Sequence, residues 1–333
     1  MGAWPYPGRV QRWSDLAEVP PGFGPSVVTL GNFDGVHAGH RVVLGRVVEA
    51  ARAAGAQAVA VTFDPHPLQV LQPDRAPEQI TGLEQRLALM AATGIDAVLV
   101  MEFTRELAQW SPERFVEEVF VGALGAVAVV VGHDTRFGHR NSGDVGTLAA
   151  LGAAHGFVVE VVDDLEPESA SRRSSSSWTR ELLAAGDVAA AATLLGRPHR
   201  LTAEVVHGDH RGRELGYPTA NLAPHVDGLV PADGVYAGWM LRSTLPEDAP
   251  DRLLPAAVSI GTNPTFDGLE RRVEAHVLDR TDLDLYGETV SLELVSRLRP
   301  TVRFDGIPAL VEQMERDVEQ CRQLLGRAIV PGA

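Results

Sequence analysis

The sequence predicts an α/β protein of two domains: a Rossmann-like domain with a parallel, doubly wound sheet, then a small antiparallel β-barrel domain with a C-terminal helix. Three observations support this prediction. The chain has 333 residues, more than one hydrophobic core usually spans. Strand-like and helix-like segments alternate in the first half, as they do in βαβ units. Short β-branched runs separated by turn residues dominate the second half, as they do in an antiparallel barrel.

The first half alternates between β-branched apolar runs and segments with the periodicity of a helix. Right-handed crossovers between such strands build a doubly wound sheet. The predicted strands are residues 26–30, 58–63, 97–101, 126–132 and 157–162, and the predicted helices are residues 39–54, 83–93, 112–120 and 147–155.

The character of the sequence changes after Gly196. Before that point we expect a serine-rich loop at residues 166–177 and one helix at residues 178–195. After it, turn residues separate short strands, and an amphipathic helix closes the chain. The predicted strands are residues 201–207, 234–241, 256–260, 272–278 and 289–298, and the last helix is residues 307–325. We therefore expect one domain at residues 1–185 and a second at residues 186–333.

The composition excludes several classes of protein. The longest apolar run, near residues 127–131, is too short to cross a bilayer. The first residues lack the apolar core of a secretory signal, so we expect a cytoplasmic protein that does not act on membranes. The single cysteine, Cys321, excludes an internal disulfide and a cysteine-based metal cluster. The net charge of −15 argues against broad binding to nucleic acid.

A glycine-rich turn with two histidines follows the first predicted strand. Residues 30–40 read LGNFDGVHAGH, and His37 and His40 are three positions apart at the start of a helix, so both can face one ligand. The helix start adds free N–H groups that attract phosphate. This combination suits a triphosphate, because two imidazoles can stabilise the charge that grows at the α-phosphate during nucleotidyl transfer. The alternative is a plain turn with two surface histidines.

Three further segments follow later elements of the first half. Phe63 with Pro65 and Pro67 forms a rigid apolar surface that suits a flat aromatic ring, although a plain strand-ending turn has the same residues. The segment GHDTRFG, residues 132–138, ends another predicted strand on the same side of the sheet. Arg180 follows a run of serines and can contact phosphates, whereas the alternative is a capped loop.

A second group of polar residues lies in the predicted barrel. Thr219 and Asn221 are two apart in an extended stretch, so their oxygens can share one Mg²⁺ with nucleotide phosphates; the alternative is a self-stabilising turn. We expect a turn at residues 261–266 and then a strand that carries Glu274 and His276 on one face. Glu274 is a candidate general base, and a surface glutamate is the alternative.

In this order, the motifs GNFDGVHAGH, TFDPHP, GHDTRFG, GRELGYPTAN, SIGTNPTF and VEAH resemble the bacterial bifunctional riboflavin kinase/FMN adenylyltransferase family from about residue 27 to residue 325. The resemblance implies that the first, nucleotidyltransferase-like domain adenylylates FMN to FAD with release of pyrophosphate. It implies that the second domain phosphorylates riboflavin to FMN. ATP is the implied co-substrate of both reactions, and Mg²⁺ is the implied cofactor.

The resemblance also implies roles for single residues. Glu274, His37 and His40 are the implied catalytic residues, and Thr219 and Asn221 are the implied Mg²⁺ ligands. The implied flavin contacts are Phe63, Pro65, Pro67, Asp134 and Phe137. The implied ATP contacts are Gly31, Phe33, Asp34, Gly39, Arg180, Gly212, Gly216, Thr219 and Asn221.

Two departures from the family pattern motivate an alternative function. Thr135 stands where the family usually has phenylalanine, and residues 175–177 are three serines where the family usually has SST. The alternative is a monofunctional riboflavin kinase whose first domain binds flavin or nucleotide weakly. Two other functions fit the sequence less well. A flavin carrier without turnover does not need a general base such as Glu274. A different adenylyltransferase that shares the histidine motif of residues 37–40 (HAGH) does not explain the second half of the chain.

Overall fold

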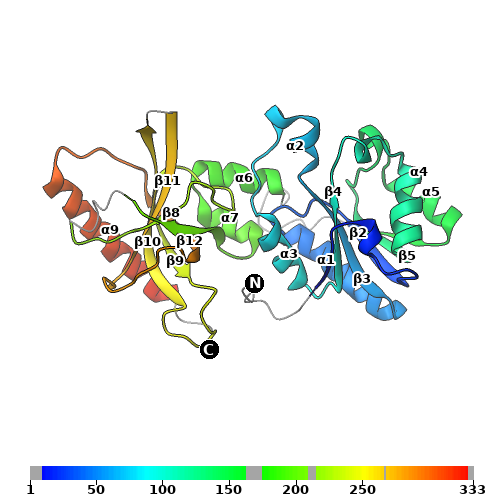
Figure 1. Cartoon of the computed structure of the whole chain (residues 1–333), viewed down its shortest axis with the longest axis horizontal. Coiled ribbons are helices and arrows are strands. Elements are labelled where there is room, and N and C mark those ends of the chain that lie inside the picture. Colours follow the sequence, from blue (N-terminus) through cyan, green and yellow to red (C-terminus); the bar gives the residue numbers. More distant parts are fainter. Residues whose placement is uncertain (1–9, 163–174, 209–214, 266–267, 329–333) are drawn as a thin grey trace. The chain divides into compact units, whose positions relative to one another are not determined.

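A computed structural model describes residues 10–162, 175–208, 215–265 and 268–328 (Figure 1). The chain divides into two compact units between Ser175 and Ser176. The predicted domain boundary after residue 185 stays a prediction. In the described residues, no helix is both long enough and apolar enough to span a bilayer.

The first unit is built on a six-stranded sheet in which all paired strands are parallel. The strand order is β1-β4-β3-β2-β5-β6, so the chain moves outward from β2 to β3 and β4 and then returns to place β5 on the other side of β2. The strands are β1 (Gln11–Trp13), β2 (Ser26–Leu30), β3 (Gln57–Asp64), β4 (Ala97–Glu102), β5 (Ala126–Gly132) and β6 (Val158–Val162).

Helices cover both faces of this sheet. On one face, Leu44 of α1 and Met90 of α3 pack in one apolar cluster with Val27 of β2. On the other face, Phe120 and Leu148 pack in a second cluster with the neighbouring strand residues. The helices are α1 (Ala38–Ala54), α2 (Pro67–Leu71), α3 (Leu83–Ala91), α4 (Pro112–Phe115), the π-helical η4 (Val116–Ala123) and α5 (Val145–His155), with short 3₁₀ turns η1 (Leu16–Glu18), η2 (Pro73–Arg75), η3 (Leu107–Gln109) and η5 (His139–Asn141).

The second unit is a closed antiparallel barrel of strand order β10-β11-β8-β7-β12-β9, preceded by two helices and followed by one. Alternate residues such as Leu201, Ala203 and Val205 are buried and fill its interior. The elements are α6 (Ser176–Ala185), α7 (Val188–Leu195), β7 (His199–Val206), β8 (Ala220–Leu222), β9 (Gly234–Leu241), β10 (Leu253–Thr265), β11 (Gly268–Val277), β12 (Thr289–Arg299) and α9 (Ile307–Ala328).

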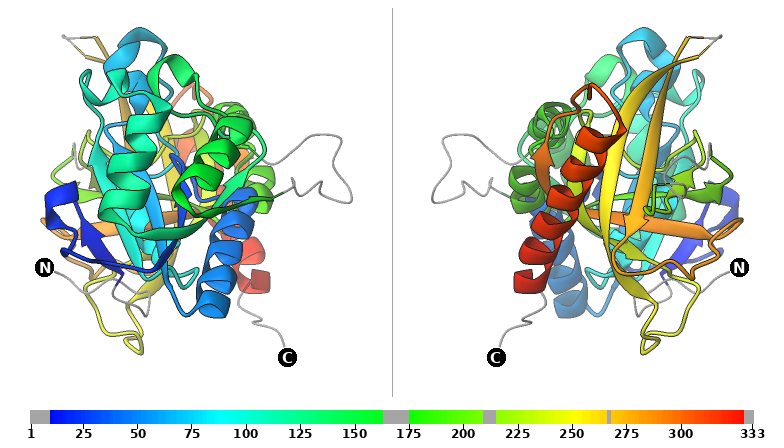
Figure 2. Two further views of the ribbon diagram at one scale, coloured as in Figure 1. Left: turned by 90° about the vertical axis from the view of Figure 1, so that its right-hand side faces the viewer. Right: turned by 90° about the vertical axis from the view of Figure 1, so that its left-hand side faces the viewer.

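The last helix, α9, packs against the outer wall of the barrel (Figure 2). Val318 and Cys321 of α9 share an apolar cluster with Ala237 of the barrel. Arg299 forms a 2.7 Å ion pair with the carboxylate of Asp317, which is 6% exposed, so the helix is fixed by charge as well as by apolar contact. Burial raises the pKa of the Cys321 thiol to about 12, so this thiol is neutral and serves packing.

The predicted fold class is confirmed, with three local corrections. The single helix predicted at residues 178–195 is two helices, because Gly186 has a φ of 78° and Asp187 caps the second helix. The turn predicted at residues 261–266 is wrong over residues 261–265, because these residues pair with β11 as the end of a longer β10. The short elements β1, α2 and β8 were not predicted.

Candidate active sites

Two histidines lie side by side where the chain leaves β2 and enters α1. His37 is the N-cap of α1, and its Nδ1 accepts a 3.4 Å hydrogen bond from the backbone N–H of His40. The two imidazole rings are stacked, with centroids 3.7 Å apart. The direction of the strand order reverses between β2 and β5, and open α/β sheets bind ligands at such a point. The structure therefore brings both predicted histidines to the edge of the sheet where a ligand is expected.

The turn between β2 and α1 has a backbone that few side chains adopt. Phe33 and Val36 have φ values of 50° and 40°, and such residues persist only where their surroundings hold them. The carboxylate of Asp34, which is 2% exposed, accepts hydrogen bonds of 3.1 Å from the N–H groups of Ile80 and Thr81. These contacts indicate that Asp34 shapes the turn, and its predicted contact with ATP stays a prediction.

The Phe33 side chain packs against His40. Its ring is buried and makes an edge-to-face contact with the His40 ring at 5.3 Å between centroids. A Cβ at Gly31 would lie 3.1 Å from the Phe33 ring, so the absence of a side chain at Gly31 makes room for this packing. Gly39 lies in the first turn of α1 and is partly exposed.

A second turn follows the neighbouring strand β3 and opens α2. His66 is the N-cap of α2: its Nδ1 accepts from the N–H of Leu68 at 3.2 Å, and its own N–H donates to Gln69. The other ring nitrogen, Nε2, lies 3.3 Å from the side-chain amide of Asn32, which follows β2. This contact joins the two turns. The prediction did not include Asn32 or His66, although both stand inside quoted motifs and the polar side chain of each was a usable signal.

Aromatic rings cluster near the same edge of the sheet. Phe63 of β3 makes an edge-to-face contact with Phe103 at 5.4 Å and lies 6.4 Å from Phe115. Phe137 lies 6.2 Å from Phe115 and is 6% exposed. Phe63 is half-buried, and Pro65 and Pro67, which follow it in the chain, are partly exposed. Phe63, Pro65 and Pro67 can therefore meet a flat ligand directly, whereas Phe137 supports the cluster from within.

Two further predicted residues lie away from these turns in the chain. Asp134 is exposed in the turn that follows β5, where the Thr135 N–H donates to the Gly132 carbonyl at 3.1 Å. Arg180 lies on α6, which belongs to the second compact unit.

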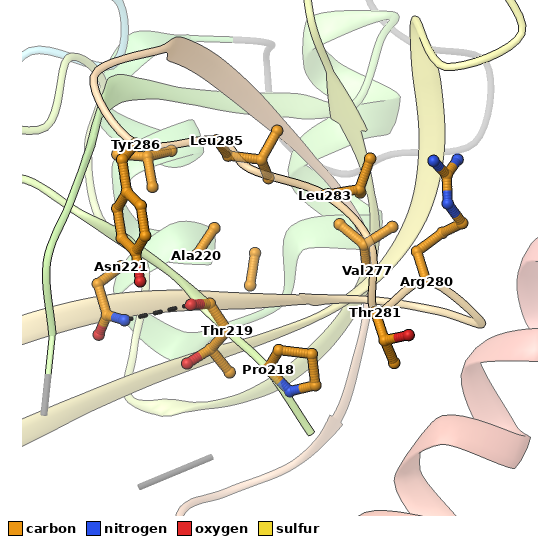
Figure 3. A pocket seen from close by; sticks show the side chains of 12 residues that line it. Pro218, Thr219, Ala220, Asn221, Val277, Arg280, Thr281, Leu283, Leu285 and Tyr286 are labelled. Atoms are coloured by element: carbon orange, nitrogen blue, oxygen red, sulfur yellow. Dashed lines mark hydrogen bonds between the residues drawn. The ribbon is translucent and has the colours of Figure 1, made fainter. Parts of the chain in front are cut away.

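In the second unit, Thr219 and Asn221 line an open pocket at the barrel (Figure 3). The Asn221 Nδ2 donates to the Thr219 carbonyl at 3.4 Å. A Cβ at Gly208 would lie 2.4 Å from the Asn221 Cγ, so the Asn221 side chain packs directly on the Gly208 backbone. Gly216 is exposed with a φ of 86°, and the predicted ATP contact Gly212 lies outside the described residues.

Glu274 meets Asn221 through the register of the barrel. The two residues are direct partners in the antiparallel pair of β11 and β8, so their side chains leave the same face of the sheet. Ala275 and Val277 of β11 line the pocket, whereas Glu274 does not. On the Glu274 face, the next residue of that face, His276, contacts Tyr217 edge to face at 5.3 Å, and burial raises the pKa of the Tyr217 phenol. Asn221 therefore borders both the pocket and the Glu274 face.

The donors of this site suit a metal ion that arrives with phosphates. A hydroxyl and an amide oxygen are hard, neutral ligands, which Mg²⁺ accepts when phosphate oxygens complete its shell. Among the described residues, no group of three or more His, Cys, Asp or Glu side chains could hold a metal ion by itself.

Comparison with known proteins gives matches in both halves of the chain. The FAD synthetase family matches residues 21–177, and the riboflavin kinase family matches residues 195–325. The bifunctional riboflavin kinase/FMN adenylyltransferase of Escherichia coli K12 is 35% identical over 300 residues, which cover 90% of this chain and 93% of that protein. Its counterpart in Listeria monocytogenes is 33% identical over 324 residues, 97% of each chain.

A solved structure extends the likeness to the fold. A protein of Streptococcus pneumoniae, described as a macrolide-efflux protein, has a TM-score of 0.82 and 31% identity, and the match covers 94% of this chain and 98% of that one. The likeness therefore includes both units.

Proposed function

The chain belongs to the bifunctional riboflavin kinase/FMN adenylyltransferase family, and from this premise we propose how its two sites divide the two reactions. The second domain phosphorylates riboflavin to FMN with ATP, and the first adenylylates FMN to FAD with release of pyrophosphate. The match of an FAD synthetase family to residues 21–177 favours both activities over a monofunctional kinase.

In the kinase reaction, ATP occupies the pocket beside Thr219 and Asn221, and riboflavin approaches from the Glu274 face. Glu274 takes the proton of the 5′-hydroxyl as its oxygen attacks the γ-phosphorus, and the bond from that phosphorus to ADP breaks. Thr219 and Asn221 would hold the Mg²⁺ that neutralises the phosphate charge. The pairing of Asn221 with Glu274 supports this arrangement, because it joins the phosphate side to the hydroxyl side.

In the adenylyl transfer, the triphosphate lies over the start of α1 against His37 and His40. An oxygen of the FMN phosphate attacks the α-phosphorus, and the bond between the α- and β-phosphates breaks to release pyrophosphate. The two imidazoles stabilise the charge of this transition state. Phe63, Pro65 and Pro67 hold the flavin ring, with Asp134 as a further flavin contact. The stacked histidines at the N-cap support this assignment most directly.

We place the reactions in the cytoplasm, with small molecules as partners and without nucleic acid or membrane. The net charge of −15 supports the exclusion of nucleic acid. The functional boundary is proposed after residue 185.

One incubation tests this function. Purified protein is mixed with riboflavin, ATP and Mg²⁺, and the flavins are separated over time. Appearance of FMN and then FAD supports both sites, and FMN supplied alone with ATP should also yield FAD. FMN that accumulates without FAD would contradict the function proposed for the first site, whereas no FMN from riboflavin would contradict that proposed for the second.

A further inference from the structure

We propose that Arg86 of α3 is a positioning residue for adenylyl transfer, which fixes the turn that carries the histidines against the turn that carries the flavin surface. This inference rests on the function proposed for the first site. Arg86 is 0% exposed, and no predicted role involves it.

The guanidinium of Arg86 binds the ends of two neighbouring strands at once. Its Nη1 donates to the carbonyl of Asn32 at 3.1 Å, and its Nη2 donates to the carbonyl of Phe63 at 3.1 Å. The Asp64 carboxylate lies 3.6 Å from Nη2. Asn32 follows β2 and leads to His37, whereas Phe63 and Asp64 end β3 and lead to Pro65.

Burial of a cation in a protein core is unfavourable in free energy. Removing a charge from water costs several kcal/mol unless hydrogen bonds compensate, and an apolar side chain would fill the same volume without that cost. The planar fork of a guanidinium can hold two carbonyls in a fixed relation. An apolar residue has no donors, and the three rotatable donors of an ammonium impose no such planar geometry. The contacts of Arg86 use this property at the place where the two turns meet.

Other contacts converge on the same residue of the first turn. The hydroxyl of Thr62 donates to the Asn32 carbonyl at 3.2 Å, and the Asn32 amide lies 3.3 Å from His66 Nε2. Asn32 is thus held through its main chain by Arg86 and Thr62 and through its side chain by His66. The position of the turn that carries the histidines, relative to the turn that carries the flavin surface, therefore depends on these contacts of Asn32.

The expected effect is on turnover rather than on binding. ATP contacts the turn that carries the histidines, and FMN contacts the turn that carries the flavin surface. A small shift between the two turns therefore leaves the contacts of each substrate with its own turn intact. In-line attack needs the reacting atoms about 3 Å apart, and a misplacement of about 1 Å can cost about 100-fold in rate. Arg86 therefore controls the alignment of FMN phosphate with the α-phosphate of ATP.

Arg86→Lys separates alignment from charge, because lysine keeps the charge and loses the fork. With FMN and ATP supplied, we expect kcat for FAD formation to fall by about 100-fold while the KM values for FMN and ATP change by less than about 3-fold. The kinase kcat of the same polypeptide should stay unchanged. Arg46→Lys is the matched control, because Arg46 lies exposed on α1 and pairs only with the surface residues Glu49 and Glu160 among the contacts found.

Three results would overturn the proposal. Unchanged kcat in Arg86→Lys would show that the fork does not align the substrates. A raised KM with unchanged kcat would make Arg86 a binding residue. If kcat falls in proportion to the fraction of folded protein, and returns to the unaltered value when it is calculated from the concentration of folded enzyme, Arg86 is a structural residue alone. No FAD from the unaltered chain would instead overturn the function proposed for the first site.

Discussion

His37 and His40 lie within one turn of α1 in the first unit, whereas Asn221 and Glu274 of the second unit come from β8 and β11 and meet only through strand register. The two histidines of the first site are thus local in the sequence, although the turn that carries them is held by more distant residues such as Arg86. The second site is assembled by the closure of a barrel. A catalytic motif can thus be visible in the sequence while the three-dimensional contacts that position its residues are not.

The largest effect should come from the residue that joins the two sides of the barrel site. Glu274→Ala should lower the kinase kcat by about 1,000-fold, because the attacking hydroxyl loses its proton acceptor. FAD formation from supplied FMN should remain at the unaltered rate. Steady-state assays of both reactions measure this, with Glu204→Ala on exposed β7 surface as the control. Loss of both activities in folded protein would break the separation of the two sites.

The reciprocal test concerns the histidines of the first unit. His37→Ala should lower FAD formation by about 100-fold and spare the kinase, because one donor to the transition state is removed. His37 is also the N-cap of α1, so His37→Asn serves as the control that keeps a capping side chain. Recovery of FAD formation in His37→Asn would mean that His37 acts only as a cap.

A smaller effect sharpens the contrast between local and assembled frameworks. Asp34→Asn should destabilise the first unit by about 1–3 kcal/mol, because an amide NH₂ replaces an oxygen that accepts from buried N–H groups. The kinase unit should unfold as before. Denaturant unfolding monitored by each activity measures the difference, and Asp74→Asn on the exposed η2 is the control. Equal loss in both units would contradict independent frameworks.

The smallest effect concerns Cys321, which only the second unit contains. Its pKa is raised from 9.0 to about 12 by burial, so the fold favours the neutral thiol. The stability it contributes is complete below pH 9 and is lost as the pH rises from 9 towards about 12. Unfolding of Cys321→Ala should lack this component. An identical alkaline profile in both proteins would contradict the prediction.

The fold class followed from patterns that are strong over short ranges. Strands β3 to β6 of the first unit are rich in valine, alanine or both, and the alternation of such runs with helices was enough to predict a parallel sheet. The three-residue β8 is too short to carry a pattern, yet it places Asn221 opposite Glu274. The Ala-rich stretch around Gly186 favours continuous helix, and only the left-handed φ of that glycine divides it.

Arg86, which the prediction missed, acts through groups that the sequence does not distinguish. Arg86 binds main-chain carbonyls, and every residue has a carbonyl, so no partner motif reveals it. The ring of His66 pairs with Asn32 across two strand ends, which needs the strand order β3-β2. Such contacts follow from the assembled sheet and not from spacing along the chain.

Gly208 shows how a residue without a functional group can decide whether a site works. A methyl group there would compete for space with the amide of Asn221, at 2.4 Å from its Cγ. In a mutational scan of this gene, position 208 should therefore be as intolerant as the reacting residues, although it has no side chain to bind substrate. A binding site can therefore depend on a position that must have no side chain.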